Sequence, residues 1–174
     1  MEISLVPISE SPQDAQRVLS WALDLWDDHI PNYSRQDWAD FYSHSAQSDY
    51  ESWAGNGQEL AYIAKRGEEL VGTIGLVDFD ELEEFRHLKP WIAAFIVNPD
   101  LRGEGIGTQI LTLLEEKAKS LGIETLHLWT EDQSAFYSKR GYRLLSSAKL
   151  ESLDIDIMQK KLLGHSAQNQ IARS

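Results

Sequence analysis

Apolar residues recur along this chain at two spacings, and the alternation between the spacings predicts an ordered series of strands and helices. Short, mostly apolar runs bounded by turn-forming residues are typical of strands. They predict seven strands, over residues 3–7, 60–65, 70–77, 91–97, 123–129, 143–148 and 153–161. The turn Arg66-Gly67-Glu68 joins the second and third of these in a hairpin, and the first is expected at a sheet edge.

Apolar residues three or four positions apart predict two helices near the start of the chain. Ser11-Pro12 has the residue types of a helix cap and first turn, and Pro31 ends the helix that follows. Ser34-Arg35-Gln36-Asp37 has the spacing that begins a second helix. Residues 43–58 are polar and contain glycine, so we expect a loop there.

A third helix is predicted between two glycines. Asn98-Pro99-Asp100 ends the strand before it, Gly105 opens the helix and Gly122 closes it. Its apolar positions recur at helical spacing, at Ile106, Ile110, Leu113, Leu114, Ala118 and Leu121. After the next strand, Thr130-Glu131-Asp132-Gln133 has capping-box spacing for a short fourth helix that carries residues 135–142.

These elements follow one another in the order β-α-α-β-β-β-α-β-α-β-β. Strands interleaved with helices in this way predict an α/β fold with a mixed sheet and helices on both faces. We expect one domain over residues 1–163 and a flexible polar tail over residues 164–174.

Composition narrows the classes of protein that this pattern can represent. The chain has 174 residues, the usual size of one domain, and can bury roughly 70% of the surface that its unfolded form exposes. Its 28 acidic residues against 16 lysines and arginines give a formal net charge of -12, which disfavours nucleic-acid binding and favours cationic partners. The absence of cysteine excludes disulfides, thiolate metal sites and a cysteine nucleophile, and no metal site is predicted.

Targeting and membrane segments are also absent from the pattern. No positively charged start leads into an apolar signal segment, and no apolar run approaches the ~20 residues that cross a bilayer. We therefore expect a soluble, cytoplasmic protein without a membrane partner.

Residues 102–107, Arg-Gly-Glu-Gly-Ile-Gly, join the strand over residues 91–97 to the third helix and predict a phosphate cradle. Glycines let the backbone approach a ligand, the first turn of a helix offers unpaired N–H groups to an anion, and Arg102 adds a guanidinium. A P-loop is excluded because the chain has no Gly-Lys pair, and a dinucleotide fingerprint is excluded because Thr108 stands where its third glycine would be. The alternative is that the glycines only allow close helix–sheet packing.

Arg-x-x-Gly-x-Gly after a strand and a proline-containing turn resembles the coenzyme A pyrophosphate motif of the GNAT N-acetyltransferase superfamily. Residues 135–142, Ala-Phe-Tyr-Ser-Lys-Arg-Gly-Tyr, resemble the second motif of that family, in which an aromatic pair precedes a helix-ending glycine-aromatic step. The resemblance covers roughly residues 58–162 in pattern. One departure is a short link without the asparagine that many members have, so Thr130 or Asp132 is expected in its place.

The resemblance implies acetyl-coenzyme A as co-substrate. The residues that it places against coenzyme A are Phe95, Ile96, Val97, Arg102, Gly103, Glu104, Gly105, Ile106, Gly107, Thr108, Thr130 and Tyr137. It also implies that the strand over residues 91–97 splays from its neighbour near a bulge and admits the pantetheine arm, whose amides then face the backbone of residues 95–97.

Acetyl transfer from a thioester to an amine requires a neutral amine, a polarised carbonyl and a proton for the departing thiolate. A strand N–H, that of Val97 or Ile96, is the candidate oxyanion donor. Tyr137 is the candidate general acid, because a phenol is protonated at neutral pH. The alternative is that Tyr137 is a core aromatic residue with a satisfied hydroxyl.

The general base is less determined by the sequence. The strand over residues 91–97 contains no acid, so the candidates lie on neighbouring segments. Asp80 and Glu81 are the preferred pair, and Asp78, His127 or a water chain are the alternatives. His127 alternates with leucines, which is more typical of a buried structural histidine.

The acceptor side is expected to be acidic and aromatic. Residues 78–84 hold five acids in seven positions, which would attract a cationic amine or simply be solvated. Most aromatic residues of the two N-terminal helices are expected in the core, while Trp38, Tyr42 and Trp53 are candidates to wall a cavity.

The sequence thus predicts an N-acetyltransferase that acts on a primary amine of a small, cationic molecule or of a protein or peptide, as a monomer or homodimer. The alternative is a non-catalytic module of the same fold that binds acyl-CoA as a sensor or interaction partner. A member that acetylates charged transfer RNA conflicts with the net charge of -12.

Overall fold

The computed structural model describes residues 1–162. Its main elements are β1 (Ile3–Pro7), α1 (Pro12–Trp26), α2 (Arg35–Ser45), β2 (Glu59–Arg66), β3 (Glu69–Val77), β4 (Trp91–Val97), α3 (Ile106–Ser120), β5 (Thr125–Thr130), α4 (Ser134–Ser138), β6 (Arg143–Leu150) and β7 (Leu153–Lys161). Short 3-10 turns lie at Ile8–Glu10, Glu83–Phe85 and Pro99–Leu101. The predicted element order is confirmed, and the tail expected over residues 164–174 lies outside the described residues.

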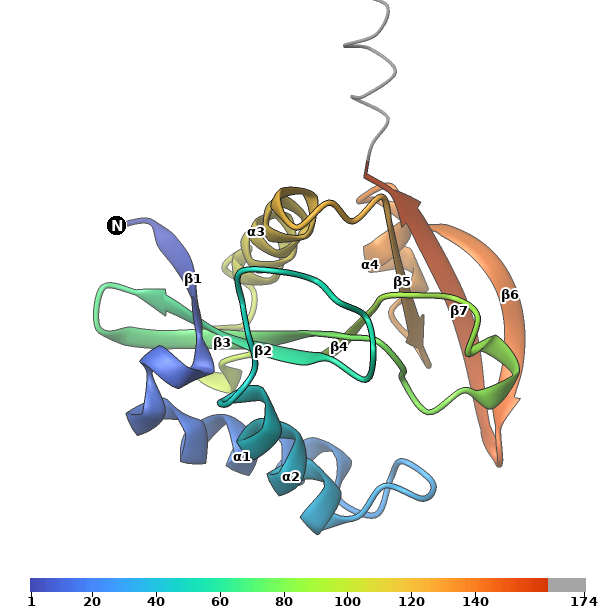
Figure 1. The fold of residues 1–174 in the computed structure, drawn as a ribbon, viewed down its shortest axis with the longest axis horizontal. Helices are drawn as coiled ribbons and strands as arrows, with labels where there is room; N and C mark the ends of the chain where they lie inside the picture. Colours follow the sequence, from blue (N-terminus) through green and yellow to red (C-terminus); the bar gives the residue numbers. More distant parts are fainter. Residues whose placement is uncertain (163–174) are drawn as a thin grey trace, which may run out of the picture.

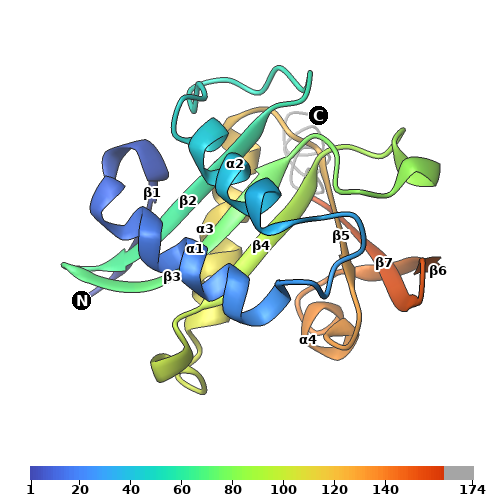
Figure 2. The same ribbon diagram turned by 90° about the horizontal axis from the view of Figure 1, so that it is seen from below.

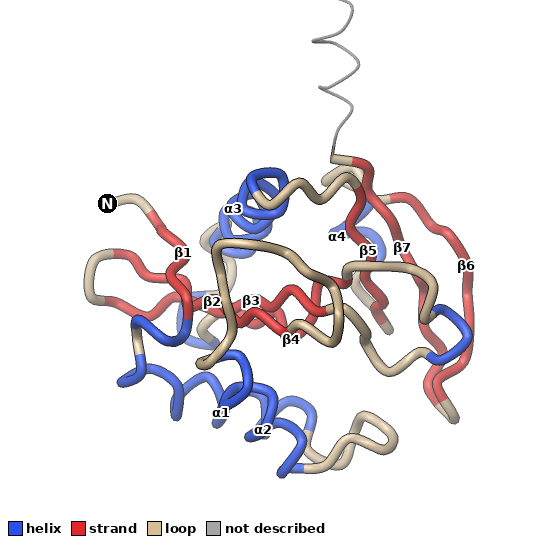
Figure 3. The backbone as a smooth tube through the Cα atoms, viewed as in Figure 1, coloured by secondary structure: helices blue, strands red, loops and turns tan. Residues whose placement is uncertain are grey.

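The strands form one mixed sheet in the order β1-β2-β3-β4-β5-β7-β6. All neighbours are antiparallel except β4 and β5. Helices α1 and α2 cover one face and α3 the other, with β5, β7 and β6 curving away at one side (Figures 1 and 2). The helices lie on the two sides of the sheet (Figure 3). The loop between α1 and α2 contacts the segment after β5, where His29 lies 2.7 Å from Glu131.

Two apolar cores hold these layers together. Ile110 and Leu114 of α3 are fully buried against one face of the sheet, and Val18 and Ala22 of α1 are fully buried against the other. Full burial of the Ile110, Leu114 or Val18 side chain stabilises the fold by about 1.5–3 kcal/mol relative to its exposed state. No helix within residues 1–162 is long and apolar enough to cross a membrane.

The sheet opens between β4 and β5. Only one residue pair, Trp91 with His127, joins these parallel strands. On its other side, β4 carries an extra residue against β3 between Thr73 and Gly75, and Ala94 in this bulge has φ 52°. The splay and bulge implied by the family resemblance are both present, and they leave the second half of β4 without a partner on the β5 side.

Four local predictions need adjustment. Helix α1 ends at Trp26, five residues before Pro31, and Asp28 with φ 59° lies in the turn that follows. The Ser11 hydroxyl does not cap α1 but donates to the carboxylate of Asp14, 2.7 Å away. Helix α2 extends to Ser45, so the loop is shorter than predicted at its start. Helix α4 ends at Ser138, before Gly141 and Tyr142, because the chain turns there through Gly141 with φ 93°.

Candidate active site

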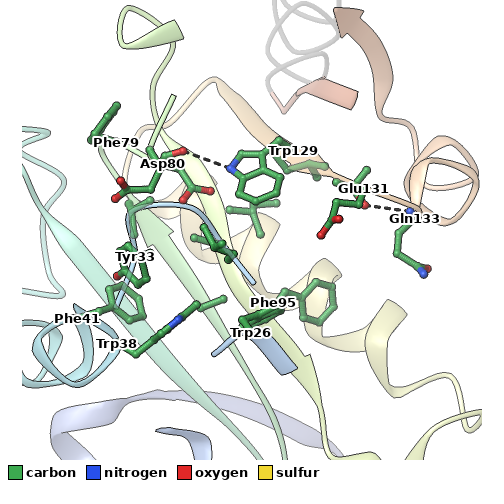
Figure 4. A pocket seen from close by; sticks show the side chains of 18 of the residues that line it. Trp26, Tyr33, Trp38, Phe41, Phe79, Asp80, Phe95, Trp129, Glu131 and Gln133 are labelled. Atoms are coloured by element: carbon green, nitrogen blue, oxygen red, sulfur yellow. Dashed lines mark hydrogen bonds between the residues drawn. The ribbon is translucent and has the colours of Figure 1, made fainter. Parts of the chain in front are cut away.

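A cavity of about 230 Å³ lies between the two N-terminal helices and the opening in the sheet. Figure 4 shows aromatic side chains from α1, α2 and their connection facing Asp80 and Trp129 across this space. The lining residues are Trp26, Ile30, Tyr33, Trp38, Phe41, Glu59, Val77, Phe79, Asp80, Glu81, Ile92, Ala93, Ala94, Phe95, Leu128, Trp129, Thr130, Glu131, Asp132, Gln133 and Tyr137. They come from segments that are far apart in the sequence, and the β4 bulge lies where these segments meet.

The bulge of β4 lies opposite Gly75, where β3 comes close to both β4 and α2. A side chain at Gly75, opposite the bulge, would place its Cβ 3.0 Å from the carbonyl oxygen of Ala93 and 3.1 Å from the ring of Phe41. Glycine is therefore needed for β3 to approach both β4 and α2 this closely. The bulge turns Ala94 and Phe95 toward the cavity, where both residues form part of the wall.

The predicted phosphate cradle lies at the first turn of α3. Gly105 is the N-cap residue with φ 77°, and no side chain caps this turn. The first N–H groups of a helix have no partner within the helix, so they are available to an anion.

The surroundings of the three glycines distinguish a cradle from mere close packing. A Cβ at Gly103 or Gly105 would meet nothing within 4 Å, so packing does not require glycine at either position. At Gly107, by contrast, a Cβ would lie 3.4 Å from Cγ2 of Val97 and 3.7 Å from the ring of Phe136. The packing alternative therefore applies to Gly107 alone, and the other two glycines border open space.

Cationic side chains surround the cradle. Arg102 is exposed, and within residues 1–162 its guanidinium forms no hydrogen bond or ion pair. Arg140 stacks 3.8 Å from the centre of the Phe136 ring and donates from Nε to Oγ1 of Thr108 at 2.9 Å. Glu104 is turned toward Arg66 at 3.8 Å, so its charge is partly balanced.

The main chain of β4 continues from the cradle to the cavity. The N–H of Asn98 donates to the carbonyl oxygen of Val71 on β3 at 2.8 Å. Because backbone groups alternate in direction along an antiparallel pair, the N–H and C=O of Val97 point away from β3, toward the open side of β4. Ile96 points its backbone toward β3 and is buried, so of the two predicted oxyanion donors only Val97 faces the opening.

Tyr137 of α4 reaches the cavity wall from the other face of the sheet. Its ring packs edge-on against Tyr142, with centroids 5.6 Å apart, and Tyr142 is held in turn by a 2.8 Å hydrogen bond to Glu115. Within the described chain the Tyr137 hydroxyl has no hydrogen-bond partner, so the alternative of a satisfied core hydroxyl is not supported. Burial raises the pKa of Tyr137 to about 12, which keeps the phenol protonated at neutral pH.

Asp80 and Glu81 both line the cavity, as predicted for the candidate base. Burial, followed by the charge of Glu81, raises the pKa of Asp80 to about 7. The indole N–H of Trp129 donates to the Asp80 carbonyl oxygen at 3.2 Å and fixes the backbone at this residue. Burial also raises the pKa of Glu81, whose φ of 65° reflects the tight turn after β3.

The other candidate bases have structural roles instead. Asp78 accepts from the N–H of Gly57 at 3.1 Å and lies 3.5 Å from Lys89, outside the cavity lining. His127 is buried, with one ring nitrogen 3.1 Å from the carbonyl oxygen of Pro90 and the other 3.2 Å from the amide of Gln159. Burial lowers its pKa, so His127 is the neutral structural histidine that its alternation with leucines indicates.

The residues expected to replace the missing asparagine reach the cavity but differ in availability. The Thr130 hydroxyl accepts from the N–H of Gln133 at 3.0 Å, so it shapes the turn before α4 and is occupied. Asp132 is exposed at the rim. The Thr130 hydroxyl therefore takes part in the turn before α4, and Asp132 lies at the rim of the cavity.

The aromatic wall differs from the prediction. Trp38 lines the cavity, but Tyr42 is buried beneath it and Trp53 packs against the core on the opposite face of the sheet, so these two predictions are wrong. Sequence reasoning missed Tyr33, Glu59 and Trp129, which lie in the connection between α1 and α2, at the start of β2 and in β5. No local pattern indicates that these segments meet at the cavity. No group of three or more His, Asp or Glu side chains within residues 1–162 is arranged to hold a metal ion.

Comparisons with known proteins give a consistent assignment. The model of the Acetyltransferase (GNAT) family matches residues 22–142. The aminoalkylphosphonate N-acetyltransferase of Salmonella typhimurium (strain LT2) is 34% identical over 88 residues, 47% of this chain and 54% of that protein. The amino-acid acetyltransferase of Pseudomonas paraeruginosa (strain DSM 24068 / PA7) is 34% identical over 59 residues, 34% of this chain and 14% of that protein.

The chain thus spans about half the length of the first of these relatives and a small part of the second. Among solved structures, an aminoglycoside 6'-N-acetyltransferase complexed with coenzyme A superposes with a TM-score of 0.67 at 18% identity. The superposition covers 93% of this chain and 97% of that one, and it shows that the two share a fold.

Proposed function

Because this chain belongs to the acetyltransferase (GNAT) family, we propose that it transfers an acetyl group from acetyl-CoA to a primary amine of a small, cationic molecule or of a peptide. The support is the meeting of two half-sites at the β4 bulge. An anion cradle and an open strand edge approach it from one side, and an acidic aromatic cavity approaches it from the other.

The residues present fit coenzyme A. The uncapped first turn of α3, with open space at Gly103 and Gly105, suits a pyrophosphate, and the unpaired guanidinium of Arg102 adds charge beside it. The exposed backbone of β4, including the N–H of Val97, suits the amides of a pantetheine arm. When bound, acetyl-CoA supplies an acyl thioester whose carbonyl carbon accepts the amine.

Main-chain groups at the bulge polarise the carbonyl in this proposal. Ala94 and Phe95 line the cavity together with Tyr137 and Asp80, whereas Val97 lies beyond the lining near Gly107. We therefore assign the oxyanion donor to the N–H of Phe95 and the N–H of Val97 to coenzyme binding, in place of the roles expected for Ile96 and Val97.

Asp80 prepares the nucleophile. An amine is protonated at neutral pH and must lose a proton before its lone pair can attack. The Asp80 carboxylate accepts that proton, and a pKa of about 7 makes it a stronger base than an ordinary aspartate. The nitrogen–carbon bond then forms as the carbon–sulfur bond breaks.

Tyr137 completes the transfer by donating its phenolic proton to the departing sulfur. The proton that the nitrogen loses on becoming an amide restores the phenol. Asp80 releases the proton that it took from the ammonium to solvent, and the protein then returns to its starting state. A pKa of about 12 means that the phenol stays protonated over the pH range in which activity can be measured. Loss of activity at high pH is therefore not expected from this residue.

Thiol release from acetyl-CoA with a panel of primary amines, combined with mass spectrometry of the products, tests the proposal. The variant Tyr137→Phe should lower kcat by roughly 10²-fold or more with little change in acetyl-CoA affinity. Tyr42→Phe is the matched control, because it removes a buried hydroxyl that has no partner and lies outside the cavity lining. Coenzyme binding without acetylation of any amine would instead identify the non-catalytic alternative.

A further inference from the structure

All charged side chains in the cavity wall are acidic. Its lining includes five carboxyl side chains, those of Glu59, Asp80, Glu81, Glu131 and Asp132, and contains no lysine, arginine or histidine. This lining lies entirely within residues 1–162. A ligand in this cavity therefore meets carboxylates and aromatic rings, but no group that could balance a negative charge.

Three of these carboxyl groups, those of Glu59, Asp80 and Glu81, line the cavity together with Tyr33. Burial raises the pKa of Tyr33, and the charges of Glu59, Asp80, Glu81 and Asp37 raise it further. Burial also raises the pKa of Glu81, and the charges of Asp37 and Glu59 add to this effect. The acids of this wall therefore repel one another.

Nearby cationic groups compensate only part of this acidic wall. His44 lies 2.7 Å from Glu59, His29 lies 2.7 Å from Glu131, and Arg86 is held by Glu83 at 2.7 Å on the surface. No ion pair within the described chain involves Asp80 or Glu81. Charges held close together without a counter-ion are costly in a partly buried site, so a bound cation would relieve the repulsion.

We propose that the acceptor is a diamine or polyamine-type cation, in which one amino group is acetylated while a second remains protonated between Glu59 and Glu81. This inference rests on the proposed acetyl transfer and names its substrate class. Asp80 serves the reacting amine, and the two glutamates remain charged to hold the second ammonium. The faces of Tyr33 and Trp38 in the same wall add cation–π stabilisation.

The same lining rejects amines that bear an acidic group. The two curated relatives are named for an aminoalkylphosphonate and for an amino acid, acceptors that carry a negative charge. Binding such an acceptor requires a cationic side chain near its acid, and this wall provides none. This chain is therefore expected to differ from those relatives in substrate class.

A matched series of acceptors tests the proposal on the wild-type protein. We compare 1,4-diaminobutane, n-pentylamine and 5-aminopentanoate, which present the same aminobutyl chain and differ at the far end in an ammonium, a methyl group or a carboxylate. The expected kcat/KM for the diamine exceeds that for pentylamine by at least about tenfold, and 5-aminopentanoate is the poorest. A smaller advantage, or preference for 5-aminopentanoate, overturns the proposal while acetyl transfer stands. No turnover with any amine overturns the proposed function itself.

Paired variants assign the effect to the cavity. Glu59→Gln with Glu81→Gln should reduce the ratio of kcat/KM for the diamine over pentylamine by about fivefold or more. Glu83→Gln with Glu84→Gln is the control, because it changes net charge equally at two exposed residues outside the lining. An unchanged ratio in the first variant, or an equal reduction in both, would contradict the assignment.

Discussion

The cradle at the start of α3 and the acceptor cavity differ in how the chain builds them. The cradle comes from one continuous segment, residues 98–108, and its main recognition groups are backbone N–H donors. The cavity combines side chains from α1, α2, β2, the segment after β3, β4, β5 and α4. Backbone recognition needs only a local conformation, whereas side-chain recognition depends on how distant elements pack.

The two regions also differ in charge. The cradle faces open space, and Arg102 beside it has no ion-pair partner within residues 1–162, in a chain whose formal net charge is -12. The cavity gathers acids without a cation in its lining. This division teaches that net charge says little about an individual site, since one protein can hold an anion and a cation at adjoining positions by placing opposite local fields there.

Removing the base in the cavity should have the largest effect. Asp80→Asn keeps the side-chain shape and abolishes proton uptake, so kcat should fall by about 10²–10⁴-fold at pH 8. In the wild type, activity should fall as the pH drops through about 7, because Asp80 then becomes protonated. Steady-state kinetics from pH 5.5 to 9 measures both effects. If the variant keeps the pH profile of the wild type, the loss of activity below about pH 7 comes from another group.

A charge placed in the cradle should break coenzyme binding alone. Gly105→Asp adds a carboxylate in the open space beside the first turn of α3, and the affinity for coenzyme A should fall by more than about a hundredfold. Gly105→Asn is the matched control, since asparagine tolerates the φ of 77° and has nearly the same shape without the charge. Calorimetric titration measures both variants. Equal affinities in the two variants would mean that charge does not matter there.

Arg102→Ala tests the cationic part of the cradle. Loss of a charge-assisted hydrogen bond should cost about 1.5–3 kcal/mol of binding free energy, or about 10- to 150-fold in Kd. Dephospho-coenzyme A lacks the 3′-phosphate. If Arg102 contacts the pyrophosphate, wild type and variant should both bind this ligand more weakly than coenzyme A, and by a similar factor. If the variant binds coenzyme A and dephospho-coenzyme A with equal affinity, Arg102 contacts the 3′-phosphate instead.

The smallest expected effect concerns stability, and it has the opposite sign to the loss of activity. The folded pKa of Asp80, about 7, exceeds its unfolded value, so the folded form binds the proton more tightly. The contribution of Asp80 to stability is present at pH 4 and is lost as the pH rises through about 7. Asp80→Asn removes the cost of burying this charge beside Glu81, so it should raise Tm at pH 8 by roughly 2–4 °C for each 1 kcal/mol that is relieved, with little gain at pH 4.

Thermal unfolding at the two pH values measures this difference. Asp154→Asn is the control, because the Asp154 side chain is 83% exposed and lies outside the cavity lining. A gain in Tm that is the same at both pH values would show that Asp80 does not carry the repulsion.

The sequence by itself determined the element order, the glycine-containing start of α3 and the short helix that carries Tyr137. Strand β4 was predicted with the bounds that the structure has, because a run of apolar residues between Pro90 and Asn98 leaves little alternative. The Arg-x-x-Gly-x-Gly segment was predicted correctly as the start of α3, and so was the segment with Tyr137 as a short helix, although that helix ends at Ser138. These features are local, since spacing, glycine and proline act over a few residues.

Only the tertiary structure decided which acids and aromatic residues face one another. Asp78 and Asp80 are two positions apart, yet Asp78 is paired with Lys89 beneath the loop while Asp80 lines the cavity beside Trp129. Tyr42 and Trp53 are excluded from the cavity, and Tyr33 and Glu59 enter it, because of the way α2 and β2 pack across the sheet. Such contacts join residues distant in sequence, and the burial that raises the pKa of Asp80 exists only once those residues have come together.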